Sequence, residues 1–172
     1  MLNPQQLNLK MPQCNLLGCS SSLFEHNTVN CWLIVNITHS FNPNPRNYAN
    51  AKEFCETAAK NGFKAGRIFE PKTQSFNEKV HAESVVVFGE NYLEQRGKQL
   101  AWHHSAWIGI NRKGGSWVYS NSGTELEFQN WYPGHPEPRE RPPYRNCGSW
   151  YNNGKWYDLP CDHYTNFICE FF

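Results

Sequence analysis

The seven cysteines among 172 residues constrain the fold of this chain more than any other residue type does. They are Cys14, Cys19, Cys31, Cys55, Cys147, Cys161 and Cys169. No two form the C-x-x-C pair that is typical of structural zinc sites. A small domain this rich in cysteine is typical of an oxidising compartment. We therefore expect one secreted or cell-surface domain that is stabilised by disulfides.

Composition excludes several classes of function. The net charge is only +1 and no basic stripe is visible, so nucleic acid is not expected as a partner. No apolar run approaches the roughly 18 residues that a membrane-spanning helix needs, so we expect no membrane insertion. The start Met1-Leu2-Asn3-Pro4 does not resemble a signal peptide and indicates a mature or trimmed chain. Asn36-Ile37-Thr38 is a glycosylation sequon, which makes Asn36 a candidate glycosylation site.

Local sequence patterns predict two helices and several short strands. Apolar residues recur at helical spacing over residues 48–61, with Asn47 as N-cap and Gly62 as the stop. A second helix is expected to start at a capping box on Ser75 and to end near Gly89. The expected strands are residues 32–37, 107–110, 116–119, 166–170 and two within 148–157. Residues 1–18 are expected to be an extension or hairpin arm, and residues 90–104 a loop.

The last third of the chain carries a series of motifs in a fixed order. They are Trp107-Ile108-Gly109-Ile110, Asn130-Trp131, Glu137-Pro138, Gly154-Lys155-Trp156-Tyr157-Asp158 and Phe167-Ile168-Cys169-Glu170, with Cys147 and Cys161 between them. This series resembles the C-type lectin-like family, whose WIGL, NW, EPN, WND and FICE elements fall in the same order. The resemblance implies an α+β fold with two helices flanking small antiparallel sheets and a long loop region. We assign residues 19–172 to this domain and residues 1–18 to an extension.

The resemblance also implies a disulfide pattern. It pairs Cys55 with Cys169 and Cys147 with Cys161. Cys19 with Cys31 resembles the additional N-terminal bridge of the long form of the family, although Cys14 could take the place of Cys19. Cys14 is our candidate for the cysteine that is left over, and it could link two chains in a disulfide-bonded homodimer.

Sugar-binding members of the family hold calcium between the EPN and WND segments, and this sequence departs from their ligand set. Glu137 and Asp158 are kept, whereas Arg139, Arg145 and Tyr157 occupy the other three ligand positions. Arginine offers no oxygen and carries a fixed positive charge. Glu140 and Asn146 are nearby oxygen donors, but they do not occupy ligand positions. We therefore expect no metal or other cofactor at this site. We expect the arginines to pair with Glu137, Glu140 or Asp158, and a guanidinium could sit between Glu137 and Asp158 in place of the metal.

Aromatic and arginine residues dominate the same region and make it a candidate contact surface. The aromatic residues are Trp131, Tyr132, Tyr144, Trp150, Tyr151 and Tyr157. Such a composition is typical of a protein hot spot, and it also suits aromatic stacking on a sugar. The competing interpretations are a solvated charged loop and, for most tryptophans, structural positions in the core.

Three binding functions and one catalytic function compete. We favour a module that recognises a protein or another surface ligand without calcium at the usual site. The alternative is a glycan-binding lectin that is calcium-independent or uses a displaced calcium site. A structural role in mineral or matrix binding comes third. An enzyme is not expected, because no nucleophile motif such as G-x-S-x-G occurs.

Overall fold

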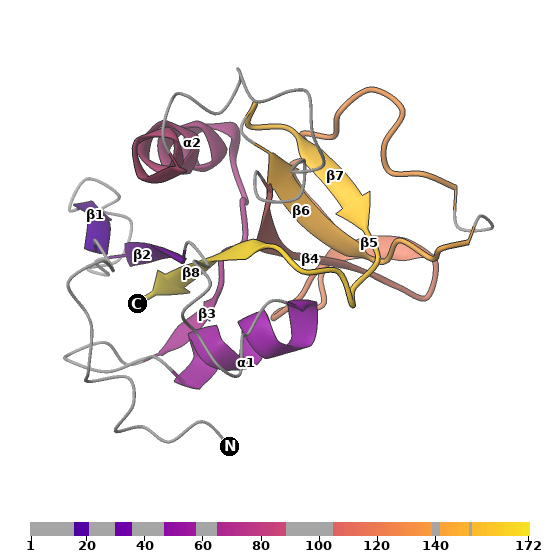
Figure 1. Cartoon of the computed structure of the whole chain (residues 1–172), viewed down its shortest axis with the longest axis horizontal. Helices are drawn as coiled ribbons and strands as arrows, with labels where there is room; N and C mark the ends of the chain where they lie inside the picture. The colour runs from indigo at the N-terminus through magenta and orange to yellow at the C-terminus, as the bar shows by residue number, and fades with distance from the viewer. Residues whose placement is uncertain are drawn as a thin grey trace.

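The computed structural model describes residues 16–20, 30–35, 47–57, 65–88, 105–138, 142–151 and 153–172, with the backbone alone for 16–20, 30–35 and 83–88. Two helices lie on opposite sides of a sheet, as the expected α+β class requires (Figure 1). The helices are α1 (Tyr48–Thr57) and α2 (Gln74–Phe88). The strands are β1 (Leu16–Ser20), β2 (Asn30–Val35), β3 (Gly66–Ile68), β4 (Ser105–Lys113), β5 (Ser116–Tyr119), β6 (Cys147–Tyr151), β7 (Trp156–Leu159) and β8 (Asn166–Phe171).

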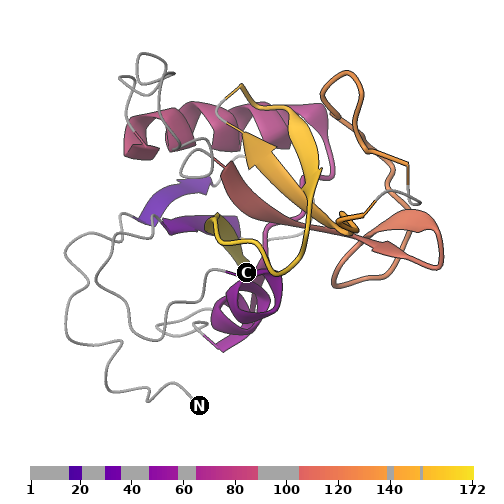
Figure 2. The ribbon, with the colours of Figure 1, turned by 45° about the vertical axis from the view of Figure 1, so that its right-hand side comes forward.

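Every predicted strand is present, and the strands join in one sheet. The order is β1-β2-β8-β4-β6-β7, with β3 paired to β8 and β5 paired to β4. The sheet is mixed rather than a set of small antiparallel sheets, because β4 and β8 run parallel while the other pairs are antiparallel. The terminal strand β8 lies between β2 and β4 and so connects the two halves (Figure 2).

The first helix begins where the sequence predicts. Asn47 caps α1, since its Oδ1 accepts a hydrogen bond from the N–H of Asn50 at 2.9 Å. The structure describes this helix as far as Thr57, and the predicted remainder up to Gly62 lies outside the described residues.

The predicted cap of the second helix is wrong by two residues. Thr73, not Ser75, is the cap of α2, and its Oγ1 accepts a hydrogen bond from the N–H of Phe76 at 3.2 Å. Two hydroxyl residues close together offer the same capping chemistry, and the sequence pattern cannot choose between them. The predicted stop at Gly89 and the predicted loop at 90–104 lie outside the described residues.

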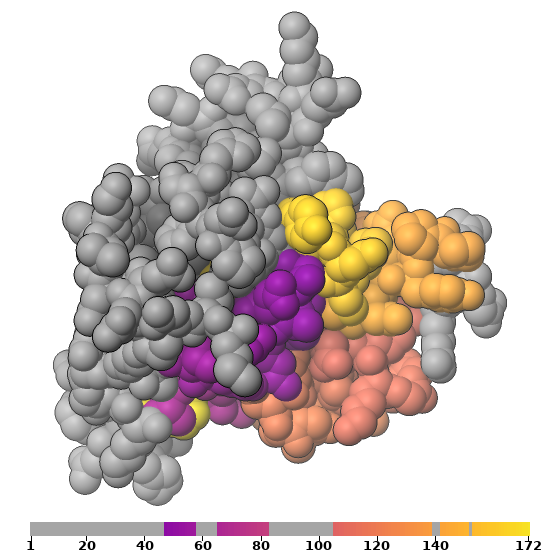
Figure 3. Space-filling model, turned by 60° about the horizontal axis from the view of Figure 1, so that its bottom comes forward, coloured from indigo at the N-terminus to yellow at the C-terminus, as the bar shows by residue number. Residues whose placement is uncertain are grey.

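The core forms two layers because neighbouring residues of a strand face opposite sides of the sheet. Trp107 and Phe167 pack toward α1, whose Tyr48 meets the Trp107 ring edge to face at 5.4 Å. Ile108 and Ile168, the next residue in each strand, pack on the other side with the α2 residue Val80. Figure 3 shows the α1 surface lying against the β4–β5 segment and the C-terminal segment.

Gly148 permits a close approach between β4 and β6. A Cβ atom at this position would lie 2.1 Å from Cγ1 of Ile110 on the neighbouring strand. No larger residue fits without moving β6, whose outer face carries part of the site described below.

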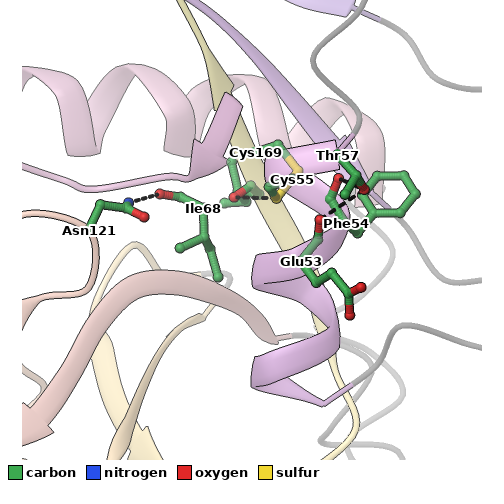
Figure 4. Close-up of a disulfide and its surroundings, with 8 residues drawn as sticks. Glu53, Phe54, Cys55, Thr57, Ile68, Asn121 and Cys169 are labelled. Carbon is green, nitrogen blue, oxygen red and sulfur yellow. Dashed lines mark hydrogen bonds between the residues drawn. A yellow bond between two sulfur atoms is a disulfide. The ribbon is translucent and has the colours of Figure 1, made fainter. Parts of the chain in front are cut away.

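Two disulfides lie in the described residues, and the first of them joins the two ends of the domain. Cys55 of α1 is bonded to Cys169 of β8 with the Cα atoms 5.3 Å apart (Figure 4). Cys147 of β6 is bonded to Cys161 with the Cα atoms 5.1 Å apart. These are the two pairs that the resemblance implies.

The N-terminal region is described only in part. β1 pairs antiparallel with β2, as a hairpin arm would, and crosses the predicted boundary between residues 18 and 19. Ser20 lies opposite Asn30, so the backbone places Cys19 close to Cys31. Their disulfide and the domain boundary remain predictions. Cys14 and Asn36 lie outside the described residues.

Candidate functional site

Asp158 forms the centre of the site and is fully buried in β7. Its Oδ1 lies 2.6 Å from Nδ1 of His135. Its Oδ2 accepts a hydrogen bond from the main-chain N–H of Glu137 at 3.0 Å. A carboxylate without water needs such partners, since burying an unpaired charge is costly. Both oxygens of Asp158 are therefore bound within the protein.

Glu137 is held at three points. Its N–H bonds to Asp158, and its C=O accepts a hydrogen bond from Nη2 of Arg112 at 2.9 Å. Its side-chain Oε1 lies 3.1 Å from Nη1 of Arg145. Two of the three links use main-chain atoms, so the path of the chain at Glu137 does not depend on its side chain. The Arg145–Glu137 side chains are 30% and 33% exposed, and such pairs contribute only about 0.2–1 kcal/mol.

A tight turn brings His135 to Asp158. The N–H of His135 donates to the C=O of Tyr132 at 2.9 Å, and this closes a turn over Pro133 and Gly134. Gly134 has a φ of 89°. A turn with proline in second place and a glycine of positive φ in third place is a type II turn. The sequence-based prediction did not include His135, although the Pro-Gly pair just before it is a turn signal.

The expected guanidinium bridge is not formed by the arginines that the structure describes. Arg145 pairs with Glu137, while His135 and a main-chain N–H occupy the oxygens of Asp158. Asp158 is fully buried, whereas Arg145 and Glu137 are both partly exposed. Of these two carboxylates, the guanidinium of Arg145 therefore binds Glu137 alone. Arg139, the other arginine at a former ligand position, lies outside the described residues.

Two further candidates from the sequence have separate outcomes. Glu140 lies outside the described residues. Asn146 contributes through its main chain, since its C=O accepts a hydrogen bond from the N–H of Arg112 at 2.8 Å. This bond holds the start of β6 beside β4, which carries the arginine that binds the Glu137 carbonyl.

Tyr157 joins an aromatic cluster, which we define as Tyr132, His135, Tyr151 and Tyr157. The Tyr157 ring stacks on Tyr132 with the centroids 4.9 Å apart, and it contacts Tyr151 at 4.3 Å and His135 at 4.7 Å. Burial raises the pKa of the Tyr157 phenol, and the hydrogen bond from Asn153 opposes this. Tyr157, which the sequence analysis assigns to a ligand position, therefore lies at the centre of a packed aromatic surface.

The tryptophans of this region pack inside the domain, as the interpretation of structural core positions predicts. Trp150 and Trp156 are buried, and Trp131 packs between Trp117 and Trp156. The exposed aromatic residues of this region are tyrosines, with Tyr132 43% and Tyr144 64% exposed. A contact surface here is therefore built from phenol rings rather than indoles.

Asn77 of α2 holds the β6–β7 turn from behind. Its Oδ1 accepts a hydrogen bond from Nε1 of Trp156 at 2.8 Å. Its Nδ2 donates to the C=O of Gly154 at 3.0 Å, where Asn130 also donates at 2.7 Å. The capping-box motif placed Asn77 in the second helix, but it did not indicate this buried contact across 77 residues of sequence.

The described residues do not fit calcium at the former ligand position. Oε1 of Glu137 and both oxygens of Asp158 already have partners inside the protein. Arg145 has no oxygen to offer, and the hydroxyl of Tyr157 bonds to Asn153 at 3.3 Å. Elsewhere in the described ranges, no group of three or more His, Cys, Asp or Glu side chains is placed to hold a metal. Calcium wants six to eight oxygen ligands, so the shortfall is large.

Comparison with known proteins places this fold among C-type lectins. The profile of the lectin C-type domain matches residues 44–171. The carbohydrate-recognition domain of the mouse scavenger receptor C-type lectin superposes with a TM-score of 0.60 at 20% identity, covering 89% of this chain and 97% of that one. Human lithostathine superposes with a TM-score of 0.57 at 19% identity, covering 83% and 91%.

Among curated proteins, the versican core protein of Rattus norvegicus is 28% identical over 87 residues. That match covers 46% of this chain and only 3% of versican. No helix in the described residues is long and apolar enough to cross a membrane. The profile match, the two disulfides and the α+β architecture agree with one another, and from them we conclude that this chain belongs to the lectin C-type domain family.

Proposed function

We propose that this domain is an extracellular recognition module that binds a protein or another surface ligand without calcium at the usual site. The observation that carries the proposal is the internal binding of both oxygens of Asp158 and of Oε1 of Glu137. Domains of this family are typically binding modules, which supports binding rather than catalysis. The disulfides and the family support extracellular placement.

The charge of Arg145 supports the same proposal. A calcium ion bound to Glu137 would lie close to this guanidinium, because Nη1 is 3.1 Å from Oε1. At separations of roughly 6–8 Å and an effective dielectric of 20, the repulsion is about 4–6 kcal/mol. Each 1.4 kcal/mol is a factor of ten in affinity, so the ion would bind far more weakly than at a site with carboxylates alone.

Protein contacts other than the Arg145 pair also hold the segment around Glu137, where we expect the ligand to bind. Arg112 holds the carbonyl of Glu137, and the buried Asp158 holds its N–H. The closed turn before His135 adds a third fixed point. A loop that is ordered before binding loses less conformational entropy when the ligand arrives. We therefore infer that the face is preorganised by protein contacts, which is the role that a metal would otherwise have.

Glycan binding is the second candidate, and one observation favours it. Tyr132 stacks nearly parallel to Tyr157, with an angle of 19° between the rings, and Tyr132 is 43% exposed. An exposed, fixed aromatic face could also pack against the apolar face of a sugar ring. A glycan bound in this way would not need calcium, so the test must separate the nature of the ligand from the role of the metal.

Binding of the labelled domain to intact cells, with and without EDTA, tests the proposal. We expect the signal to be unchanged by EDTA and to be lost when the cells are first treated with protease. Tyr132→Ala should weaken binding at least tenfold, since truncating a central aromatic contact costs about 2 kcal/mol or more. Tyr164→Ala is the matched control, because Tyr164 is 63% exposed and lies in the connection between β7 and β8.

A glycan array run in parallel decides between the two candidates. EDTA-resistant binding to defined glycans, reduced by Tyr132→Ala, would make the calcium-independent lectin the correct function. Loss of all binding in EDTA would contradict both candidates, because it would show that a metal holds the ligand or the loop.

A further inference from the structure

Two arginines bind Glu137, and each keeps a buried donor that has no partner among the described residues. Oε1 of Glu137 is paired with Arg145, and both oxygens of Asp158 are bound within the protein. Nε of Arg112, Nε of Arg145 and Nε1 of Trp117 are buried and have no partner among the described residues. Arg112 lies 5.1 Å over the Trp117 ring and donates to the C=O of Glu137, while Arg145 binds the Glu137 side chain. The region therefore has spare capacity for an acceptor with negative charge.

The Arg145–Glu137 pair is the contact that a ligand can replace most easily. Both side chains are about one-third exposed, and solvent screening keeps such a pair weak. Releasing the Glu137 carboxylate leaves its two main-chain hydrogen bonds, to Asp158 and Arg112, in place. A carboxylate from outside could thus take the guanidinium of Arg145 without unfolding the loop. The bidentate geometry of arginine and carboxylate suits this exchange.

The neighbours of Arg145 suit a protein ligand. Tyr144, next in sequence, is 64% exposed. Tyrosine and arginine are the residues enriched at the centres of protein interfaces. An arginine next in sequence to an exposed phenol ring suits a carboxylate on a polypeptide surface, where side chains around the acid can pack against that ring.

We propose that Arg145 recognises a carboxylate on an acidic segment of a partner protein, which displaces Glu137 from the guanidinium. Glu137 then acts as an internal competitor that keeps Arg145 paired until the partner binds. This inference rests on the proposed function, because it assumes that the face binds a protein without calcium. It assigns the chemistry of the partner and the residue that reads it.

Two substitutions in the same ion pair should have opposite effects. Poly-L-glutamate serves as the probe, with binding measured by surface plasmon resonance on the whole chain. Arg145→Gln should weaken binding at least tenfold. Glu137→Gln should strengthen it by up to about fivefold, which corresponds to the roughly 1 kcal/mol of the internal pair. Both variants lose the same pair, so a role limited to clamping the loop would weaken binding in both.

The controls separate a specific site from general charge. Lys52→Gln removes one positive charge from α1, where Lys52 pairs with Glu56 at 3.8 Å, and should leave poly-L-glutamate binding unchanged. Equal losses in Lys52→Gln and Arg145→Gln would overturn the inference. So would heparin that binds more tightly than poly-L-glutamate and competes with it, since the site would then read a sulfated polysaccharide.

An EDTA arm separates this inference from the proposed function. Loss of poly-L-glutamate binding in EDTA would contradict the proposed function and this inference together. Binding to cells that resists EDTA, without any binding of poly-L-glutamate, would overturn this inference alone.

Discussion

Replacing both Cys55 and Cys169 by alanine is expected to lower the free energy of unfolding by about 5 kcal/mol. This disulfide closes 114 residues, and a constraint on so long a loop removes much of the entropy of the unfolded chain. It also ties α1 to β8 across the core layer that contains Trp107 and Phe167. Equilibrium denaturation with guanidinium chloride measures the loss directly.

The second disulfide provides the matched comparison. Cys147 and Cys161 are separated by only 14 residues, so the same entropy argument gives about 3 kcal/mol for the double alanine variant. The longer loop should therefore be the more costly to open, by about 2 kcal/mol. A larger loss from the Cys147–Cys161 variant would show that native packing around β6, rather than the entropy of the unfolded chain, dominates the stabilisation.

Asn77→Leu is expected to lower the free energy of unfolding by about 2–3 kcal/mol. Asn77 is buried, and the change leaves the N–H of Trp156 without its acceptor and removes a donor to the C=O of Gly154. An unsatisfied buried donor costs about 1–3 kcal/mol. For a chain of this size, such a loss lowers Tm by roughly 5–10 °C. Differential scanning calorimetry provides the measurement.

Asn130→Leu is the control for this prediction. Asn130 binds the same carbonyl of Gly154 at 2.7 Å, but it is only partly buried and water can replace it. We expect a loss of about 1 kcal/mol, near the typical net value of one hydrogen bond. An Asn130→Leu variant that is as unstable as Asn77→Leu would show that the Trp156 contact contributes little.

Local signals predicted most of the fold. The Trp107-Ile108-Gly109-Ile110 segment located β4, and the hydrogen-bonding capacity of Asn47 located the start of α1. The start of α2 was wrong because Thr73 and Ser75 can each cap a helix. The single mixed sheet was also missed, since the parallel pairing of β4 with β8 joins strands that are 60 residues apart, Ala106 and Asn166, and no local pattern encodes it.

The site was predictable as a position but not as a set of contacts. The motifs located Glu137 and Asp158 and predicted that Arg145 and Tyr157 stand at expected ligand positions. They could not show that Asp158 binds His135, because that contact depends on the path of the turn at Gly134. Asn77 was missed for a similar reason, since its partners lie on strands and turns far along the chain.

Calorimetric titration of the metal-free domain with calcium tests the central claim most directly. The claim is that protein groups have replaced the metal between Glu137 and Asp158. It predicts no heat of site binding up to millimolar calcium and an unchanged Tm in EDTA. Calcium binding at micromolar concentration that is abolished by Glu137→Gln would contradict it, and would make a calcium-dependent lectin the function that the site supports best.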